Sequence, residues 1–123
     1  ASIVFSDEAA LLDLNAITHK AVKEKVIHIL GINRELAAID AIELFDGGLA
    51  EICDVTVAIT APVEDRIQRL LERDGISYEH AALRLRAQKP EEYFREKCDY
   101  VLENNGTQAE FHEKCLAFFG SLL

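Results

Sequence analysis

The feature that most limits how this chain folds is a run of β-branched residues leading directly into an amphipathic segment. The run VTVAIT at residues 55–60 is the strongest strand signal in the sequence, because β-branched side chains pack well on a pleated, buried surface. Pro62 fits the first position of the helix that follows, and Gly75 ends that helix after about Asp74. A strand followed by a helix in this way is a building block of α/β folds.

Apolar runs and helical patterns alternate on both sides of this unit. The runs LAAIDAI at 36–42 and DYVLEN at 99–104 predict two further strands, and strands that alternate with helices indicate a mainly parallel sheet. Two further helices are predicted before these strands, from Ser6 or Asp7 to Leu14 and from Asn15 to Leu30, with Gly31 as the stop. After the helix that ends at Gly75, another is predicted from about Tyr78 to Gln88 with Ser77 as its cap, followed by a short helix opened by Pro90. A final helix is predicted over 107–122, with these residues facing inward: Phe111, Cys115, Leu116, Phe118 and Phe119.

Length and charge limit the possible partners. The 123 residues, half of them apolar, suit one compact domain. With 22 acidic against 13 basic residues, the net charge of −9 argues against a broad nucleic-acid or anionic-membrane surface, because such partners need extended positive potential. Any anion site must therefore be local.

Neither a membrane span nor a secretion signal is indicated. No apolar run approaches roughly 18 residues, and the N-terminus lacks a charged-then-apolar pattern, so we expect a cytoplasmic protein. Cys53, Cys98 and Cys115 lack C-x-x-C spacing, and we interpret them as small buried hydrophobic residues. His112 lies three residues from Cys115, but two ligands do not make a metal site, and none is expected.

Three arginines mark the helix after the strongest strand. At 100° per residue, Arg66, Arg69 and Arg73 share an arc of about 60° beside the apolar face. Guanidinium groups placed in this way can converge on a phosphate through charge-assisted hydrogen bonds. They can equally form a solvated face in which Asp65 pairs with Arg69 at i,i+4.

The next predicted helix carries a second polar pair. Arg84 and Gln88 are spaced i,i+4, and the turn from Gly75 to Ser77 would fold their helix back toward the first. The two helices predict either a cationic lid over a nucleotide or an ordinary helical hairpin.

Five segments then follow one another along almost the whole chain: VFSDEAALLDLNAITHKAV, AIDAIELFDGGL, CDVTVAITAPVEDRIQRLLERDGIS, LRAQ and CDYVLENNGT. In this order they resemble the dephospho-coenzyme A kinase family, P-loop kinases related to the nucleoside monophosphate kinases. The resemblance implies a parallel-sheet, three-layer α/β/α P-loop kinase-like fold whose sheet is incomplete. It implies a single domain with acceptor-side helices at about 1–35, core strands within 36–61 and 99–103, lid-like helices at 62–97 and a C-terminal helix at 107–122.

The resemblance also implies a reaction, the transfer of the ATP γ-phosphate to the ribose 3′-hydroxyl of dephospho-coenzyme A, with Mg²⁺ expected in the complete enzyme. Lid arginines close over the phosphates in such transfers. Arg66 stands where the family is more variable. The roles implied are catalytic for Arg69, Arg73 and Arg84, nucleotide-binding for Gln88, Asn104 and Gly106, and substrate-binding for His19 and Asp46.

Each of the last residues also has a purely structural explanation. His19 can be an ordinary residue of an amphipathic helix, and Asp46 can cap or turn the chain before two glycines. The sequence NNG at 104–106 is above all a turn, because Asn and Gly tolerate positive φ.

The sequence departs from the family pattern in two places. It contains no G-x-x-x-x-G-K-[ST] motif, so the loop whose amides cradle phosphates is absent from these residues, and we expect no catalysis by them alone. Ile42 and Glu43 stand where the family has Pro and Leu, and Asp46 replaces the usual Glu.

The resemblance also predicts self-association. In the family the first strand lies between those that match 37–42 and 55–60. Without it, either these two strands pair directly or two chains complete each other's sheet, because an exposed, unpaired strand edge invites association. Two other functions stay open: a related kinase with another small acceptor, and an α/β binding module without catalysis.

Overall fold

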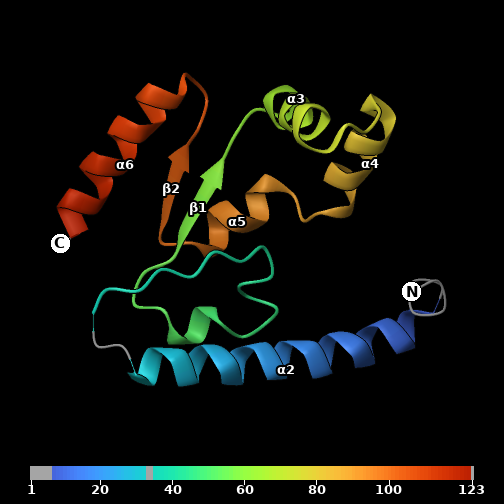
Figure 1. Ribbon diagram of the computed structural model, residues 1–123, viewed down its shortest axis with the longest axis vertical. Helices are drawn as coiled ribbons and strands as arrows, with labels where there is room; N and C mark the ends of the chain where they lie inside the picture. The colour runs from blue at the N-terminus through green and yellow to red at the C-terminus, as the bar shows by residue number, and fades with distance from the viewer. Residues whose placement is uncertain (1–6, 33–34, 123) are drawn as a thin grey trace. The chain divides into compact units, whose positions relative to one another are not determined.

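The computed structural model describes residues 7–32 and 35–122 (Figure 1). Its contacts gather in two compact units, one up to Asp54 and one from Val55 onward. The organisation of the chain as a single domain stays a prediction.

The first unit begins with one long helix, α2 (Glu8–Ile32). Asp7 caps it as predicted, because its Oδ1 accepts hydrogen bonds from the backbone N of Ala9 at 3.0 Å and of Ala10 at 3.2 Å. The alternative cap, Ser6, lies outside the described residues. The predicted break at Asn15 is wrong, since a single asparagine costs a helix only a fraction of a kcal/mol.

Two further predictions for the first unit are wrong. Gly31 lies inside α2 instead of ending it, and positive φ occurs among the described residues only at Gly48 and Gly75. Residues 36–41 form no strand and continue into a turn over 42–48. The backbone of this segment is not part of the sheet in the described residues, which consists of β1 (Val57–Thr60) and β2 (Tyr100–Glu103), and Leu36 is 77% exposed. Of the two strands on which the predicted self-association rests, that at 37–42 is therefore not formed, and self-association stays a prediction.

The turn closes back on itself and buries one side chain. The backbone N of Gly47 donates to Glu43 O at 2.7 Å, and the N of Leu49 donates to Leu44 O at 3.0 Å. Gly48, with φ of 73°, supplies the left-handed residue that this turn requires. Leu49, 5% exposed, is buried just before the 3₁₀ helix η1 (Ala50–Ile52).

The second unit is built around two parallel strands, β1 (Val57–Thr60) and β2 (Tyr100–Glu103). Both were predicted, and their parallel pairing confirms the α/β assignment. The pairing continues beyond each end, because Tyr100 N donates to Thr56 O at 3.1 Å and Asn104 N donates to Thr60 O at 2.7 Å.

A reciprocal pair of side chains fixes the start of the strands. Asp99 Oδ2 accepts from Thr56 N at 2.8 Å and from Thr56 Oγ1 at 3.0 Å, and Thr56 Oγ1 in turn accepts from Asp99 N at 3.1 Å. These bonds lower the pKa of Asp99. Because Thr56 is buried, they keep its polar groups satisfied.

Four helices complete the described part of this unit: Figure 1 shows α5 beside β1 and α6 beside β2, and α3 packs against α4. Local chemistry sets their ends as predicted. Gly75, with φ of 62°, ends α3, and Ser77 Oγ accepts from His80 N at 3.2 Å to cap α4. Pro62 precedes α3 by one residue instead of opening it. The bounds are α3 (Val63–Asp74), α4 (Tyr78–Ala87), α5 (Glu91–Lys97) and α6 (Gln108–Leu122).

The core of the second unit is small. Ile67 of α3 and Ala81 of α4 are 2% and 0% exposed, and Phe118 of α6 packs edge-on against Tyr100 with ring centroids 5.2 Å apart. The predicted inward face of α6 is wrong in part, because Leu116 and Phe119 are exposed at 56% and 47%. The three cysteines are half-buried instead of fully buried.

Candidate functional site

An open hollow of about 670 Å³ lies between α3 and α4. Arg66, Arg69 and Arg73 all line this hollow. The prediction that they lie on one face of α3 is therefore confirmed. The lining residues are Arg66, Arg69, Leu70, Glu72, Arg73, Leu85 and Gln88.

The hollow is cationic within an acidic chain. Three guanidinium groups line it against a single carboxylate, that of Glu72. The predicted pairing of Asp65 with Arg69 is not formed. Arg69 is exposed and has no carboxylate partner in the described part of the chain. Its donors can therefore reach an anionic ligand without first breaking an ion pair.

One cross-helix hydrogen bond joins the start of α3 to the end of α4. Arg66 Nη2 donates to Gln88 Oε1 at 2.7 Å. Gln88, predicted to bind the nucleotide, thus holds Arg66 at the hollow. The sequence predicted Arg66 and Gln88 on successive helices, and the hydrogen bond between them is seen only in the structure.

At the other end of α3, one carboxylate holds two arginines. Arg73 donates from Nε to Asp74 Oδ1 at 2.7 Å and from Nη2 to Oδ2 at 3.0 Å, while Arg84 Nη1 donates to Oδ2 at 2.6 Å. The hydrogen bond from Arg73, and then that from Arg84, lower the pKa of Asp74 to about 2. The hydrogen bond to Asp74 in turn raises the pKa of Arg73. Arg84 does not line the hollow and joins the group through Asp74.

Asp74 was not singled out from the sequence, although a signal was present. An acidic residue at the last position of a helix faces the negative end of the helix dipole, which is unfavourable without a cation nearby. Two arginines supply that compensation here.

The predicted nucleotide-binding residues Asn104 and Gly106 lie just after β2. Asn104 continues the strand ladder through its bond to Thr60. A Cβ at position 106 would meet the carboxylate at the end of the flexible Glu110 side chain, which would have to shift, and Gly106 does not have a positive φ.

The same carboxylate caps α6. Glu110 Oε2 accepts from Thr107 N at 2.6 Å, and Thr107 Oγ1 accepts from Glu110 N at 3.2 Å, which is a capping box. The bonds to Thr107 lower the pKa of Glu110. The loop at 104–106 is therefore tied at its far end to the first turn of a helix.

The predicted acceptor-side residues both belong to the first unit. His19 is half-buried on α2, and its Cδ2 would lie 3.9 Å from a Cβ at Gly47, next to the exposed Asp46. Lys23, one turn further along α2, donates to Glu51 Oε2 at 2.8 Å and lowers the pKa of Glu51. Helix α2 thus holds the turn that carries Asp46.

Residues 7–32 and 35–122 contain no cluster of three or more His, Cys, Asp or Glu side chains arranged to hold a metal ion. Nor does any helix in this part of the chain combine the length and apolarity needed to cross a membrane.

A hairpin of arginine-bearing helices, α3 and α4, follows the first of two parallel strands, and these elements belong to a P-loop kinase-like α/β protein. The crystal structure of TT1252 from Thermus thermophilus has this fold in common with the chain, with a TM-score of 0.81 and 32% identity over 100% of this chain and 65% of that one. The family is also defined. The sequence model of the dephospho-CoA kinase family (CoaE) matches residues 1–110, and the chain belongs to this family.

Individual relatives agree with the family assignment. The chain is 32% identical over 123 residues to a dephospho-CoA kinase of Thermus thermophilus and 32% identical over 124 residues to that of Syntrophotalea carbinolica. These matches cover 99% and 98% of the chain but 61% and 59% of the relatives. The chain therefore spans about three fifths of their length.

Proposed function

We propose that the protein takes part in the ATP-dependent phosphorylation of the ribose 3′-hydroxyl of dephospho-coenzyme A. The observation that carries this proposal is the cationic hollow between α3 and α4, where Arg66, Arg69 and Arg73 face a single lining carboxylate. Membership of the dephospho-CoA kinase family supplies the reaction.

In this proposal α3 and α4 form the lid over the phosphates of ATP. Phosphoryl transfer spreads negative charge over the transferring group, and catalysis consists mainly of positioning and charge stabilisation. Arg69 meets that charge with donors that no carboxylate of the described chain engages, and Arg73 comes with its guanidinium already fixed by Asp74. Arg84 supports Arg73 through the same carboxylate and reaches the phosphates when the lid closes.

The remaining predicted site residues bind the two substrates, ATP and dephospho-coenzyme A. Asn104 and Gly106 form the loop against the adenine, and Gln88 orients Arg66 beside the nucleotide. His19 and Asp46 lie on the side of dephospho-coenzyme A, on α2 and on the turn that α2 holds.

ATP is the phosphate donor in this proposal, and Mg²⁺ would neutralise charge on its phosphates when bound. Magnesium usually keeps several waters and takes one or two carboxylates besides phosphate oxygens. These 123 residues contain no G-x-x-x-x-G-K-[ST] loop, so we assign them binding and charge stabilisation and no turnover of their own.

Calorimetric titration tests the binding part of the proposal. We expect the chain to bind ATP and, independently, dephospho-coenzyme A, with ATP binding weakened by salt because it depends on guanidinium–phosphate contacts. A chain that binds neither ATP nor dephospho-coenzyme A would contradict the proposed function.

A chimera tests the reaction itself. This chain would replace the matching segment of the Thermus thermophilus relative, which is 61% of that protein's length. We expect a folded chimera to convert dephospho-coenzyme A to coenzyme A with ATP, and its Arg69→Gln variant to lose most of that activity. A folded chimera that binds both substrates without turnover would contradict the assignment of the lid residues.

A further inference from the structure

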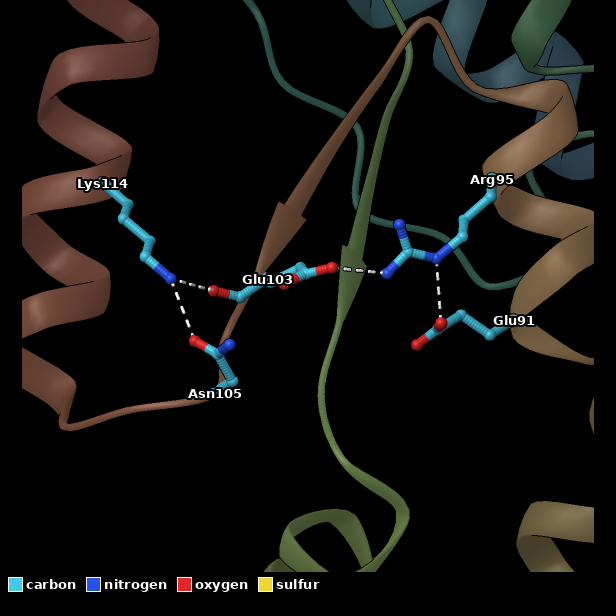
Figure 2. Close-up of polar contacts among 5 residues, drawn as sticks. All are labelled: Glu91, Arg95, Glu103, Asn105 and Lys114. Carbon is cyan, nitrogen blue, oxygen red and sulfur yellow. Dashed lines mark hydrogen bonds and ion pairs between the residues drawn. The ribbon is translucent and has the colours of Figure 1, made fainter.

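Lys114 of α6 reaches back to the loop that follows β2 (Figure 2). Its Nζ donates to the backbone carbonyl of Glu103 at 2.9 Å and to Asn105 Oδ1 at 3.0 Å. One ammonium group therefore crosslinks the last residue of the strand to the middle residue of the loop 104–106. No sequence pattern pointed to this lysine.

Glu103 is held from the opposite direction as well. Its Oε1 accepts from Arg95 Nη2 at 2.7 Å, and Arg95 Nε donates to Glu91 Oε2 at 2.8 Å, one turn back on α5. Figure 2 shows Arg95 and Lys114 approaching from the helices on either side of the strands. The hydrogen bond and charge of Arg95 lower the pKa of Glu103.

The loop is thereby fixed at three successive points. Asn104 is held by the strand ladder, Asn105 by Lys114, and the residue after Gly106 by the capping box with Glu110. A hydrogen bond to a charged donor is stronger than one between neutral groups, and an amide oxygen fixed in this way also fixes the direction of its NH₂ group.

We propose that Lys114 is a positioning residue for the base-binding loop: it holds Asn105 and the end of β2 so that residues 104–106 present fixed donors and acceptors to a purine base. This inference rests on the proposed function for the identity of the ligand. It goes beyond that function in assigning a role to α6, which carries none of the predicted site residues.

The role is indirect, which separates Lys114 from the lid arginines. Arginines of the hollow act on phosphate, so their loss weakens ATP and inorganic tripolyphosphate alike. Lys114 acts through the loop, so its loss should weaken ATP and leave tripolyphosphate unchanged. The ratio of the two affinities therefore reports positioning and not net charge.

The test uses the 123-residue chain with three substitutions. Lys114→Met removes the ammonium, Lys114→Arg keeps a charged donor able to reach both acceptors, and Lys20→Met makes the same chemical change at an exposed position of α2. Calorimetry gives the dissociation constants for ATP and tripolyphosphate, and amide hydrogen exchange by NMR follows residues 104–107 without ligand.

For Lys114→Met we expect ATP binding to weaken about threefold to tenfold, the loss of one or two hydrogen bonds. We also expect tripolyphosphate binding to stay within twofold and the loop amides to exchange faster. Lys114→Arg should restore most of both effects, and Lys20→Met should show neither.

Two results would overturn the proposal: loop amides that exchange in Lys114→Met as in the parent chain, or equal losses for ATP and tripolyphosphate. If the parent chain binds neither compound, the proposed function fails. The positioning of the loop by Lys114 is then decided by the exchange rates alone, because they require no ligand.

Discussion

Arg84 Nη1 lies 2.6 Å from Asp74 Oδ2, and this ion pair joins α4 to the last residue of α3. Because Arg73 holds the other oxygen of the same carboxylate at 2.7 Å, Asp74 fixes two predicted lid arginines at once. The arrangement makes the acid stability of the hairpin depend on one side chain.

The first prediction concerns pH. The pKa of Asp74 is lowered in the folded chain to about 2 from an ordinary value of 3.8, so its contribution to stability is present above the ordinary value and is lost as the pH falls toward 2. We expect Asp74→Asn to lower the thermal midpoint at pH 6, and the difference from the parent chain to shrink between pH 4 and pH 2.

Thermal unfolding followed by circular dichroism across this range provides the measurement. Asp13→Asn, at an exposed position of α2, is the matched control. Its difference in thermal midpoint from the parent chain should not shrink between pH 4 and pH 2. A difference between Asp74→Asn and the parent chain that is constant from pH 6 to pH 2 would show that the ion pairs of Asp74 contribute nothing.

The second prediction separates Arg69 from the other arginines. Since Arg69 is exposed and no carboxylate of residues 7–32 and 35–122 engages it, Arg69→Gln should change the free energy of unfolding by less than about 0.5 kcal/mol. The same substitution should weaken tripolyphosphate binding about tenfold, because charged hydrogen bonds to phosphate are strong.

Calorimetry and urea unfolding on the same variant give both quantities. Arg86→Gln is the control, since Arg86 is exposed on α4 but does not line the hollow. Equal losses of affinity in the two variants would indicate a general charge effect and not a site.

The parts of the fold that depend on local chemistry could be predicted from the sequence. Gly75 ends α3 and Ser77 caps α4, because left-handed backbone and side-chain capping are properties of single residues. The parallel pair of β1 and β2 followed from the alternation of apolar runs with helical segments.

The parts that depend on a partner could not be predicted. The apolar run at 36–42 has the composition of a buried strand, but a strand also needs a neighbour for its backbone, and in the described residues this run is not part of the β1–β2 sheet. The arginine face was visible in the spacing of α3. Its ties to Gln88 and Asp74 depend on how α3 and α4 pack, which no helical spacing specifies.

The third prediction concerns the core residue of α3. Ile67 is 2% exposed on the face of α3 opposite to solvent, so Ile67→Ala should cost about 2–5 kcal/mol of unfolding free energy through lost burial and a cavity. Ile67→Val removes a single methylene and should cost about 0.5–1.5 kcal/mol. Urea unfolding of both variants checks the order, and equal costs would contradict the tight packing of this side chain.

The last prediction concerns the loop after β2. A methyl group at Gly106 would clash with the Glu110 carboxylate, which must then move and release Thr107 N. We expect Gly106→Ala to cost about 1 kcal/mol, the value of a helix cap. Glu110→Ala already lacks that bond and leaves room for the methyl group, so adding Gly106→Ala to it should cost much less. A double-mutant cycle in urea measures the difference. Equal costs of Gly106→Ala in the two backgrounds would mean that the glycine is required for another reason, since only the Glu110 carboxylate distinguishes them.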